Sequence, residues 1–281
     1  MTTKLLTIFT RTPLHVGAGS SVGAVDLPVI RERHTRFPII PGSSLKGVLA
    51  DLWNEKIENE KGELKTSRSK EGLKLFGSTD SKAAESGYLL IGEGKLLAFP
   101  VRSAKGCFAW ITCPLALNRF YRDSNSEKRI QSVGENSVIV TQESEVKFSR
   151  EVIFEEYKLS IEAILSEKVV DSLKELVTDT VWRDMPKKLA IVSDEMFTYF
   201  VENTCEIAQH IKINDETGVV AGGALFSQEN VPSEALFYSV LNERKDGMFE
   251  MLAKGLEAEN NLLQIGADMT TGLGWCSVKL V

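Results

Sequence analysis

The chain has 281 residues, of which 43% are hydrophobic and 26% are charged, and its formal net charge is −6. This length suits one large domain or two modest ones, and the composition is that of an ordinary globular protein. The N-terminal stretch is too short and too interrupted by Lys4, Thr7 and Thr10 for a signal peptide, and no apolar run approaches the roughly 20 residues that span a bilayer. We therefore expect a cytoplasmic protein without a membrane partner.

A first strand and a glycine loop open the chain. Residues 4–12 are rich in β-branched and aromatic side chains and predict a strand that ends at Pro13. The loop at residues 17–23 follows, and Asp26 comes just after it. The glycine spacing is G-x-G-x-x-x-G with no helix after it, and the chain has no G-x-x-x-x-G-K-[ST] motif, so dinucleotide and P-loop sites are excluded. Such a loop lets the backbone approach a ligand closely, although a flexible connection is the commoner explanation.

An amphipathic helix is predicted next. Pro41 keeps the chain extended, and Gly42-Ser43-Ser44 has the composition of a helix N-cap. Apolar residues then recur at helical spacing over residues 45–57. Lys46 stands in the first turn, where a cation opposes the helix dipole unless an anion such as a phosphate docks there. A solvated surface lysine is the alternative.

Positive charge is concentrated at the start of the chain. Residues 1–50 contain six Lys and Arg against two Asp and Glu, a net charge of +4, so the remaining residues carry −10. This partition favours a local site for a polyanion, although the whole-chain charge argues against one.

The middle of the chain combines a polar insertion with short strands. Residues 61–88 are polar apart from the stretch 73–77 and predict a long surface insertion. In residues 118–129, arginines alternate with Phe120 and Tyr121, which is a weak RNA-contact signal, and a solvated loop is favoured because acidic residues dilute it. Short apolar or alternating segments predict strands at residues 89–91, 96–101, 108–113, 137–140 and 151–165.

The C-terminal half again mixes helices and strands. Helices are predicted at residues 166–181, 193–200 and 247–259, a hairpin at 206–226 with its turn at 214–218, and strands at 234–242, 262–265 and 275–281. Without regular βαβ alternation, this order predicts an α+β fold. A second glycine loop, at residues 266–274, precedes the last strand. Because both glycine loops flank strands that can lie side by side, we expect them to share one RNA-facing surface.

Several motifs together indicate a family. The run H-x-G-x-G…G-x-V-D-x-P-x-x-R…P-x-I-P-G-S-S-L-K-G at residues 15–47 resembles the RAMP superfamily of CRISPR RNA-binding proteins, as does G-A-D-M-T-T-G-L-G-W at 266–275. With L-F-G at 75–77, L-A-F-P-V-R-S at 97–103, C-P at 113–114 and G-A-L-F at 223–226 followed by V-P, the chain is most similar to the backbone subunit, the fourth subunit, of type III-B (Cmr) effector complexes. Each motif alone is weak, but the combination is specific and spans nearly the whole chain.

The resemblance implies a fold and a set of partners. It implies one domain over residues 1–281, with an RRM-like (ferredoxin-like) core and insertions that include a long β-hairpin thumb at about residues 204–237. The implied partners are a CRISPR guide RNA, a complementary single-stranded target RNA, further copies of the chain in a helical filament, and other Cmr subunits.

The same resemblance implies that Asp26 cleaves the target RNA, and the chemistry of that step points to a divalent cation, Mg²⁺ or Mn²⁺, held by Asp26. Attack by a ribose 2′-OH on the adjacent phosphate requires a deprotonated nucleophile, which a carboxylate supplies directly or by holding an ion. An aspartate near its ordinary pKa is a poor base, so metal assistance is the more natural role. A turn-capping aspartate before Pro28 is the alternative. His15 can be interpreted in two ways that fit the sequence equally well. It orients RNA or takes part in acid–base chemistry, or it is a histidine at a strand end whose hydrogen bonds are satisfied within the protein.

The resemblance also assigns RNA binding to the two glycine loops, to one arginine and to the helix start. Ser227 departs from the family pattern, because similar proteins often have an aromatic residue there, and so does Ala50, where many have an arginine. The first departure would reduce cutting and the second would weaken a guide contact. The residues implied to bind RNA are Gly17, Gly19, Arg31, Gly42, Ser43, Ser44, Lys46, Thr270, Thr271 and Gly272.

We therefore expect a metal-dependent, guide-directed endoribonuclease that acts within a complex. Two alternatives stay open. One is a non-catalytic scaffold that binds guide RNA, and the other is the backbone subunit of a type III-A complex, against which the chain length argues. A free-standing guide-processing nuclease fits least, since no histidine–tyrosine–lysine cluster is apparent.

Overall fold

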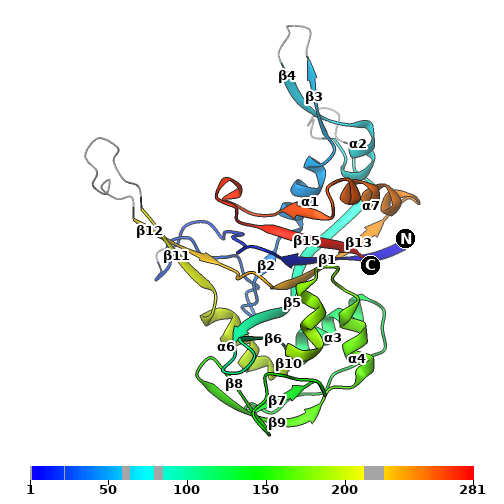
Figure 1. The fold of residues 1–281 in the computed structure, drawn as a ribbon. Coiled ribbons are helices and arrows are strands. Elements are labelled where there is room, and N and C mark those ends of the chain that lie inside the picture. Colours follow the sequence, from blue (N-terminus) through cyan, green and yellow to red (C-terminus); the bar gives the residue numbers. More distant parts are fainter. Residues whose placement is uncertain (1, 22, 59–63, 79–84, 212–224) are drawn as a thin grey trace.

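The computed structural model describes residues 2–21, 23–58, 64–78, 85–211 and 225–281. Its centre is a β-α-β-β-α-β unit whose four strands lie in the order β15-β1-β13-β5, with every neighbouring pair antiparallel (Figure 1). This connectivity is that of a ferredoxin-like split βαβ unit, so the predicted α+β class and RRM-like core are confirmed. The six elements are β1 (Thr2–Thr10), α1 (Gly42–Asp51), β5 (Leu89–Arg102), β13 (Leu236–Glu243), α7 (Met248–Ala258) and β15 (Trp275–Leu280).

Both faces of this central sheet are buried. Alternate side chains of a strand point to opposite faces, and in β1 Leu6 and Ile8 belong to one hydrophobic cluster while Leu5 and Phe9 belong to another. The first cluster includes the apolar faces of α1 and α7. The second includes those of α3 (Pro114–Asp123) and α4 (Glu167–Lys174). Burial of β1 on both sides from Leu5 onward explains why residues 5–9 form an apolar run interrupted only by Thr7.

The long segment between β5 and β13 extends the sheet into a second lobe below the core in Figure 1. Its outer strands lie in the order β6-β10-β7-β9-β8 beyond β5, while β14 (Leu262–Gln264) forms the opposite edge and β2 (Ile39–Ile40) also pairs with β5. No helix in the described residues is long and apolar enough to cross a membrane. The lobe contains β6 (Phe108–Thr112), β7 (Ser137–Val140), β8 (Glu151–Phe154), β9 (Tyr157–Ile164), η1 (Val181–Asp184), α5 (Met185–Lys188), β10 (Leu189–Val192) and α6 (Asp194–Asn203).

Two hairpins project from the body as separate two-stranded sheets (Figure 1). One pairs β3 (Asn54–Glu58) with β4 (Leu64–Arg68). The other pairs β11 (Glu206–His210) with β12 (Phe226–Asn230) where the thumb was expected, and the predicted turn at 214–218 lies outside the described residues. Because β13 begins at Leu236 within the central sheet, the last two residues of the predicted thumb range belong to the core.

The predicted extent and capping of the first long helix are wrong. Helix α1 begins at Gly42 with Pro41 at the N-cap position, and no serine side chain caps it. It ends at Asp51, because Trp53 leaves the helix to pack beside Phe76, with ring centroids 5.5 Å apart, and the chain then enters β3. The helical spacing of apolar residues beyond that point is therefore fortuitous.

Other differences from the sequence-based predictions have similar causes. The segment 61–88 is more than a surface insertion, since it contains β4 and α2 (Lys70–Phe76), whose Leu75 and Phe76 are buried. The two strands predicted within 89–101 are one, β5. Residues 118–123 are helical in α3, whose Phe120 and Tyr121 are buried and unavailable to RNA. The helix predicted at 166–181 is the shorter α4.

Candidate functional site

The two glycine loops lie side by side, as expected, because β1 and β15 are neighbours in the sheet. Thr10 at the end of β1 pairs with Cys276 near the start of β15. Beyond this pair, the Ala267 amide donates to the His15 carbonyl at 2.9 Å. Gly266 has φ +85°, and a Cβ there would stand 2.2 Å from the same carbonyl oxygen, so only glycine allows this contact.

Asp26 is exposed on the first loop and is held by Ser227, the second residue of β12. The amide and the hydroxyl of Ser227 each donate to Asp26 Oδ2 at 2.8 Å, and the Asp26 amide donates to Ser227 Oγ at 3.1 Å. These bonds, first the backbone one and then the hydroxyl one, lower the pKa of Asp26 below its ordinary value. Asp26 is therefore ionised at neutral pH, and its Oδ1 makes no hydrogen bond within the described residues.

His15 is 5% exposed and is held by the same strand. Its Nδ1 lies 2.7 Å from the Glu229 carbonyl oxygen, which can only accept, so Nδ1 carries the proton. In the neutral ring, Nε2 is then the unprotonated nitrogen. It faces Gly17, where a Cβ would stand 2.8 Å from Nε2. The expected RNA-binding Gly17 is therefore also required for the packing of His15.

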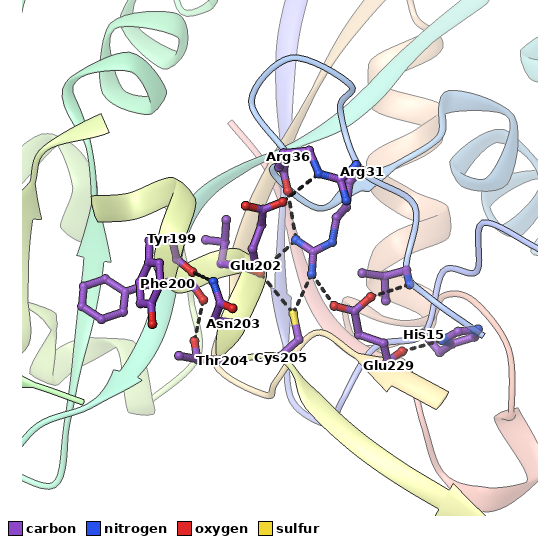
Figure 2. A network of polar contacts seen from close by, with 12 residues as sticks. His15, Arg31, Arg36, Tyr199, Phe200, Glu202, Asn203, Thr204, Cys205 and Glu229 are labelled. Atoms are coloured by element: carbon purple, nitrogen blue, oxygen red, sulfur yellow. Dashed lines mark hydrogen bonds and ion pairs between the residues drawn. The ribbon is translucent and has the colours of Figure 1, made fainter. Parts of the chain in front are cut away.

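Arg31 lies inside the protein, contrary to the expectation that it contacts RNA. Its Nη2 pairs with the Glu229 carboxylate and donates to Cys205 Sγ at 3.3 Å, while Nη1 donates to the carbonyls of Val201 at 2.8 Å and Arg36 at 2.9 Å (Figure 2). The side chain is 5% exposed. Burial raises the pKa of the Cys205 thiol to about 12 and keeps it neutral, so Glu229 balances the charge of Arg31.

The C-terminal loop offers exposed side chains and is tied to β12. Thr270 and Thr271 are exposed in the short turn η2 (Met269–Thr271), and Gly272 follows at φ +86°. Gln228 Nε2 donates to Asp268 Oδ2 at 2.8 Å. Consecutive residues of β12 therefore hold the Asp26 loop, the C-terminal loop and His15.

The remaining expected RNA-binding residues lie on the first loop and on α1. Gly19 has φ +93°, and a Cβ added there would meet no atom within 4 Å. Ser43 and Lys46 are exposed and Ser44 is half-buried, while Gly42 lies against β5, where a Cβ would stand 2.9 Å from the Ile91 carbonyl oxygen. Because α1 has no side-chain cap, the amides of its first turn have no side-chain acceptor in the described structure.

The site predicted from the sequence did not include the residues of β12, which hold the two loops and His15 in place. Gln228, Glu229 and Asn230 are all buried and polar. Four consecutive polar residues, S-Q-E-N, between the apolar G-A-L-F and V-P motifs were the available signal, because buried polar side chains need specific partners.

The donor set at Asp26 fits a shared cation but not one held by the protein alone. Within the described residues, no three His, Cys, Asp or Glu side chains come together as a metal-binding group. Asp26 offers one ionised carboxylate with a free oxygen. Mg²⁺ is commonly held by one or two carboxylates together with waters and substrate phosphates, and this arrangement supplies that minimum.

Comparison with known proteins places the chain in a family. A family model described as the RAMP superfamily matches residues 7–277. The chain belongs to the RAMP superfamily.

Several proteins are similar to this RAMP chain over nearly the full length of both chains. The chain is 36% identical over 296 residues to the CRISPR system Cmr endoribonuclease Cmr4 of Pyrococcus furiosus, and the alignment covers 100% of this chain and 96% of the relative. The crystal structure of oligomeric Cmr4 from Pyrococcus furiosus superposes with a TM-score of 0.74 at 30% identity, covering 100% and 98% of the two chains. A chain of the type III-B Cmr-beta complex bound to cognate target RNA has the same fold, with a TM-score of 0.76 at 20% identity and coverage of 100% and 97%.

Proposed function

We propose that this chain is a repeated backbone subunit of a type III-B CRISPR ribonucleoprotein in the cytoplasm, where it binds guide RNA and cleaves the complementary target RNA. The observation that carries the proposal is Asp26, an exposed and ionised carboxylate held in place on a glycine loop. Its support from relatives is the full-length similarity to a protein named Cmr endoribonuclease. Copies of itself in a filament and other Cmr subunits are the proposed protein partners, in keeping with the oligomeric crystal form of that relative.

RNA binding rests on the surface around the two glycine loops and on the start of α1. Lys46, Ser43 and the open amides of the first turn suit a phosphate of the guide backbone. The hairpin β11–β12 exposes apolar side chains suited to stacking against bases, and the rings of His210 and Phe226 stack on each other, 5.0 Å apart, at the end of the two strands that points away from the body. Neither contact reads a base edge, so binding is independent of the guide sequence.

Cleavage proceeds by attack of a target ribose 2′-OH on the adjacent phosphate, which leaves a cyclic phosphate and a 5′-OH end. The lowered pKa of Asp26 makes it a weak proton acceptor at neutral pH, because general bases work best with a pKa near the operating pH. We therefore propose that Asp26 acts chiefly by holding a divalent cation, Mg²⁺ or Mn²⁺, against the target phosphate. When bound, such an ion stabilises the charge that develops on the phosphoryl oxygens and lowers the pKa of a coordinated hydroxyl.

The other residues of the site bind the RNA and orient it. The unprotonated Nε2 of His15 can accept a hydrogen bond from a ribose hydroxyl, and Thr270 can donate to a phosphate oxygen, whereas the Thr271 hydroxyl donates to the Asp268 carbonyl at 2.9 Å. The scaffold alternative assigns these same residues to RNA binding and assigns nothing to Asp26. Full-length similarity to a Cmr relative favours type III-B over type III-A.

Asp26→Asn tests the proposal in the reconstituted complex. We expect target cleavage in Mg²⁺ or Mn²⁺ to fall by about 100-fold or more, because the side chain loses its charge but keeps its size. Guide and target affinities should be unchanged. The measurement is cleavage of a labelled complementary RNA, read as a ladder at regular intervals, beside a filter-binding assay. A variant that cuts as fast as the wild type, or a wild type that binds the target and gives no ladder, would establish the scaffold function instead.

A further inference from the structure

We propose that Ser227 is the positioning residue of Asp26: it fixes the carboxylate through Oδ2 so that Oδ1 alone faces the target RNA. This inference rests on the proposed function of Asp26 and adds a second, separable residue to it. Ser227 touches no reacting atom itself. It acts only through the orientation of the carboxylate.

The contact between the two residues is reciprocal. Ser227 donates twice to Oδ2, and its Oγ accepts from the Asp26 amide. The next backbone pair continues the contact, since the Leu27 amide donates to the Ser227 carbonyl at 3.0 Å and the Glu229 amide donates to the Leu27 carbonyl at 2.9 Å. The backbone of the loop is therefore held alongside β12 whatever side chain stands at position 227.

The hydroxyl of Ser227 has a specific task within this contact. It is the one side-chain donor to Asp26 among the described residues, and with the Ser227 amide it holds Oδ2 from two directions. With two donors fixed on Oδ2, rotation of the carboxylate is restricted and Oδ1 keeps one direction. An alanine at 227 would leave the backbone amide as the single donor to Oδ2.

Such restriction matters because reaction rates depend steeply on geometry. A displacement of about 1 Å at a reacting group can cost about 100-fold in rate while binding is preserved. The effect of losing the hydroxyl should therefore appear in the cleavage step. Guide and target binding should be untouched, since Asp26 is exposed and binding rests on other residues.

The test uses the reconstituted complex with three variants of the full chain. Ser227→Ala removes the hydroxyl, Ser227→Thr retains it, and Ser233→Ala is a matched control, because Ser233 makes no hydrogen bond within the described structure. Each is measured for single-turnover cleavage of labelled target and for target affinity. We expect Ser227→Ala to cut about 10- to 100-fold more slowly with unchanged affinity, and Ser227→Thr and Ser233→Ala to match the wild type.

Rescue by the conservative variant separates positioning from a merely structural role. Ser227→Thr restores the hydroxyl donor to Asp26 Oδ2, so its cleavage rate should return to that of the wild type while Ser227→Ala stays slow.

Three results would overturn the inference. The first is Ser227→Ala cutting as fast as the wild type while Asp26→Asn does not cut, which leaves the ribonuclease function standing. The second is a loss of target affinity in Ser227→Ala as large as its loss of rate, and the third is Ser227→Thr cutting as slowly as Ser227→Ala. If the wild type itself gives no cleavage, the proposed function fails first.

Discussion

At the scale of single residues, Glu234 shows how one carboxylate makes the stability of the fold depend on pH. It lies in the turn between β12 and β13, and its buried Oε2 has no hydrogen-bond partner within the described residues. Burial, together with the nearby Asp179, raises the pKa of Glu234 to about 7, which Arg11 offsets only in part. An acid with a raised folded-state pKa binds its proton more tightly in the folded chain. The contribution of Glu234 to the free energy of unfolding is therefore complete below pH 4.5 and is lost as the pH rises through 7.

Glu234→Gln should remove this dependence, because glutamine is neutral at every pH and has nearly the same shape. The melting temperature of the wild type, measured relative to the variant, should fall between pH 5 and pH 8. Glu143→Gln is the control, since Glu143 is exposed and without an ion pair in the described structure. A difference between wild type and Glu234→Gln that stays constant across this range would contradict the assignment.

Arg31 is the residue whose partners the sequence did not reveal. Nothing near it in the sequence announces its partner Glu229, which lies 198 positions away. The contact of Asp26 with Ser227 spans 201 positions and is equally invisible in local patterns. The motifs located the loop that carries the site, while the side chains that fix its geometry come from β12, whose place depends on the complete fold.

At the scale of elements, two helical glycines differ in the space that is available for a side chain, and the difference arises because α7 packs on Trp53. A Cβ on Gly255 of α7 would stand 2.2 Å and 2.3 Å from two ring carbons of Trp53, whereas a Cβ on Gly47 of α1 would meet nothing within 4 Å. Both positions are helical. The close approach of helix and indole at Gly255 leaves no volume for a methyl group.

Alanine at each glycine should therefore shift stability in opposite directions. Gly255→Ala should lower the free energy of unfolding by about 1–3 kcal/mol through overpacking. Gly47→Ala should raise it by about 0.5–1 kcal/mol, because alanine loses less backbone entropy in a helix. Urea unfolding of the two variants measures both effects. Equal shifts would show that the Trp53 contact adapts without cost.

The errors in the predicted elements have the same origin in packing. Gly92 and Gly94 looked like breaks between two strands, but both lie inside β5, where they admit the close approach of β13 and β2. In α3, the charged residues concealed a helix whose Leu117, Phe120 and Tyr121 face the second hydrophobic cluster. Strand order in the core, by contrast, followed from the recognised family.

At the scale of the whole molecule, the positive charge of residues 1–50 is partly neutralised by ion pairs within the protein. Arg11, Arg31 and Arg36 pair with Asp179, Glu229 and Glu202, all from the acidic remainder of the chain. Lys4, Arg33 and Lys46 form no ion pair within the described residues. The sequence therefore overstated the charge available to a polyanion.

Lys46→Ala should weaken guide binding to the same degree for every guide sequence. Because one phosphate contact is lost, the slope of log affinity against log salt concentration should become shallower by about 0.7, the value for one contact on a single strand. Lys4→Ala is the matched control, since Lys4 stands at the opposite end of β1 from the two glycine loops. Salt titrations of guide binding measure both variants. An unchanged slope in Lys46→Ala would remove α1 from the RNA interface.

The alternation of side chains along β12 also limits how this chain can change in evolution. Ser227 and Glu229 point to the segment 26–31, while Gln228, between them, is directed to Asp268. Insertion or deletion of a single codon within residues 226–230 would exchange the two faces and separate Asp26, Arg31 and Asp268 from their partners in one event. Point substitutions in this strand are open to selection one residue at a time, but changes of its length are not.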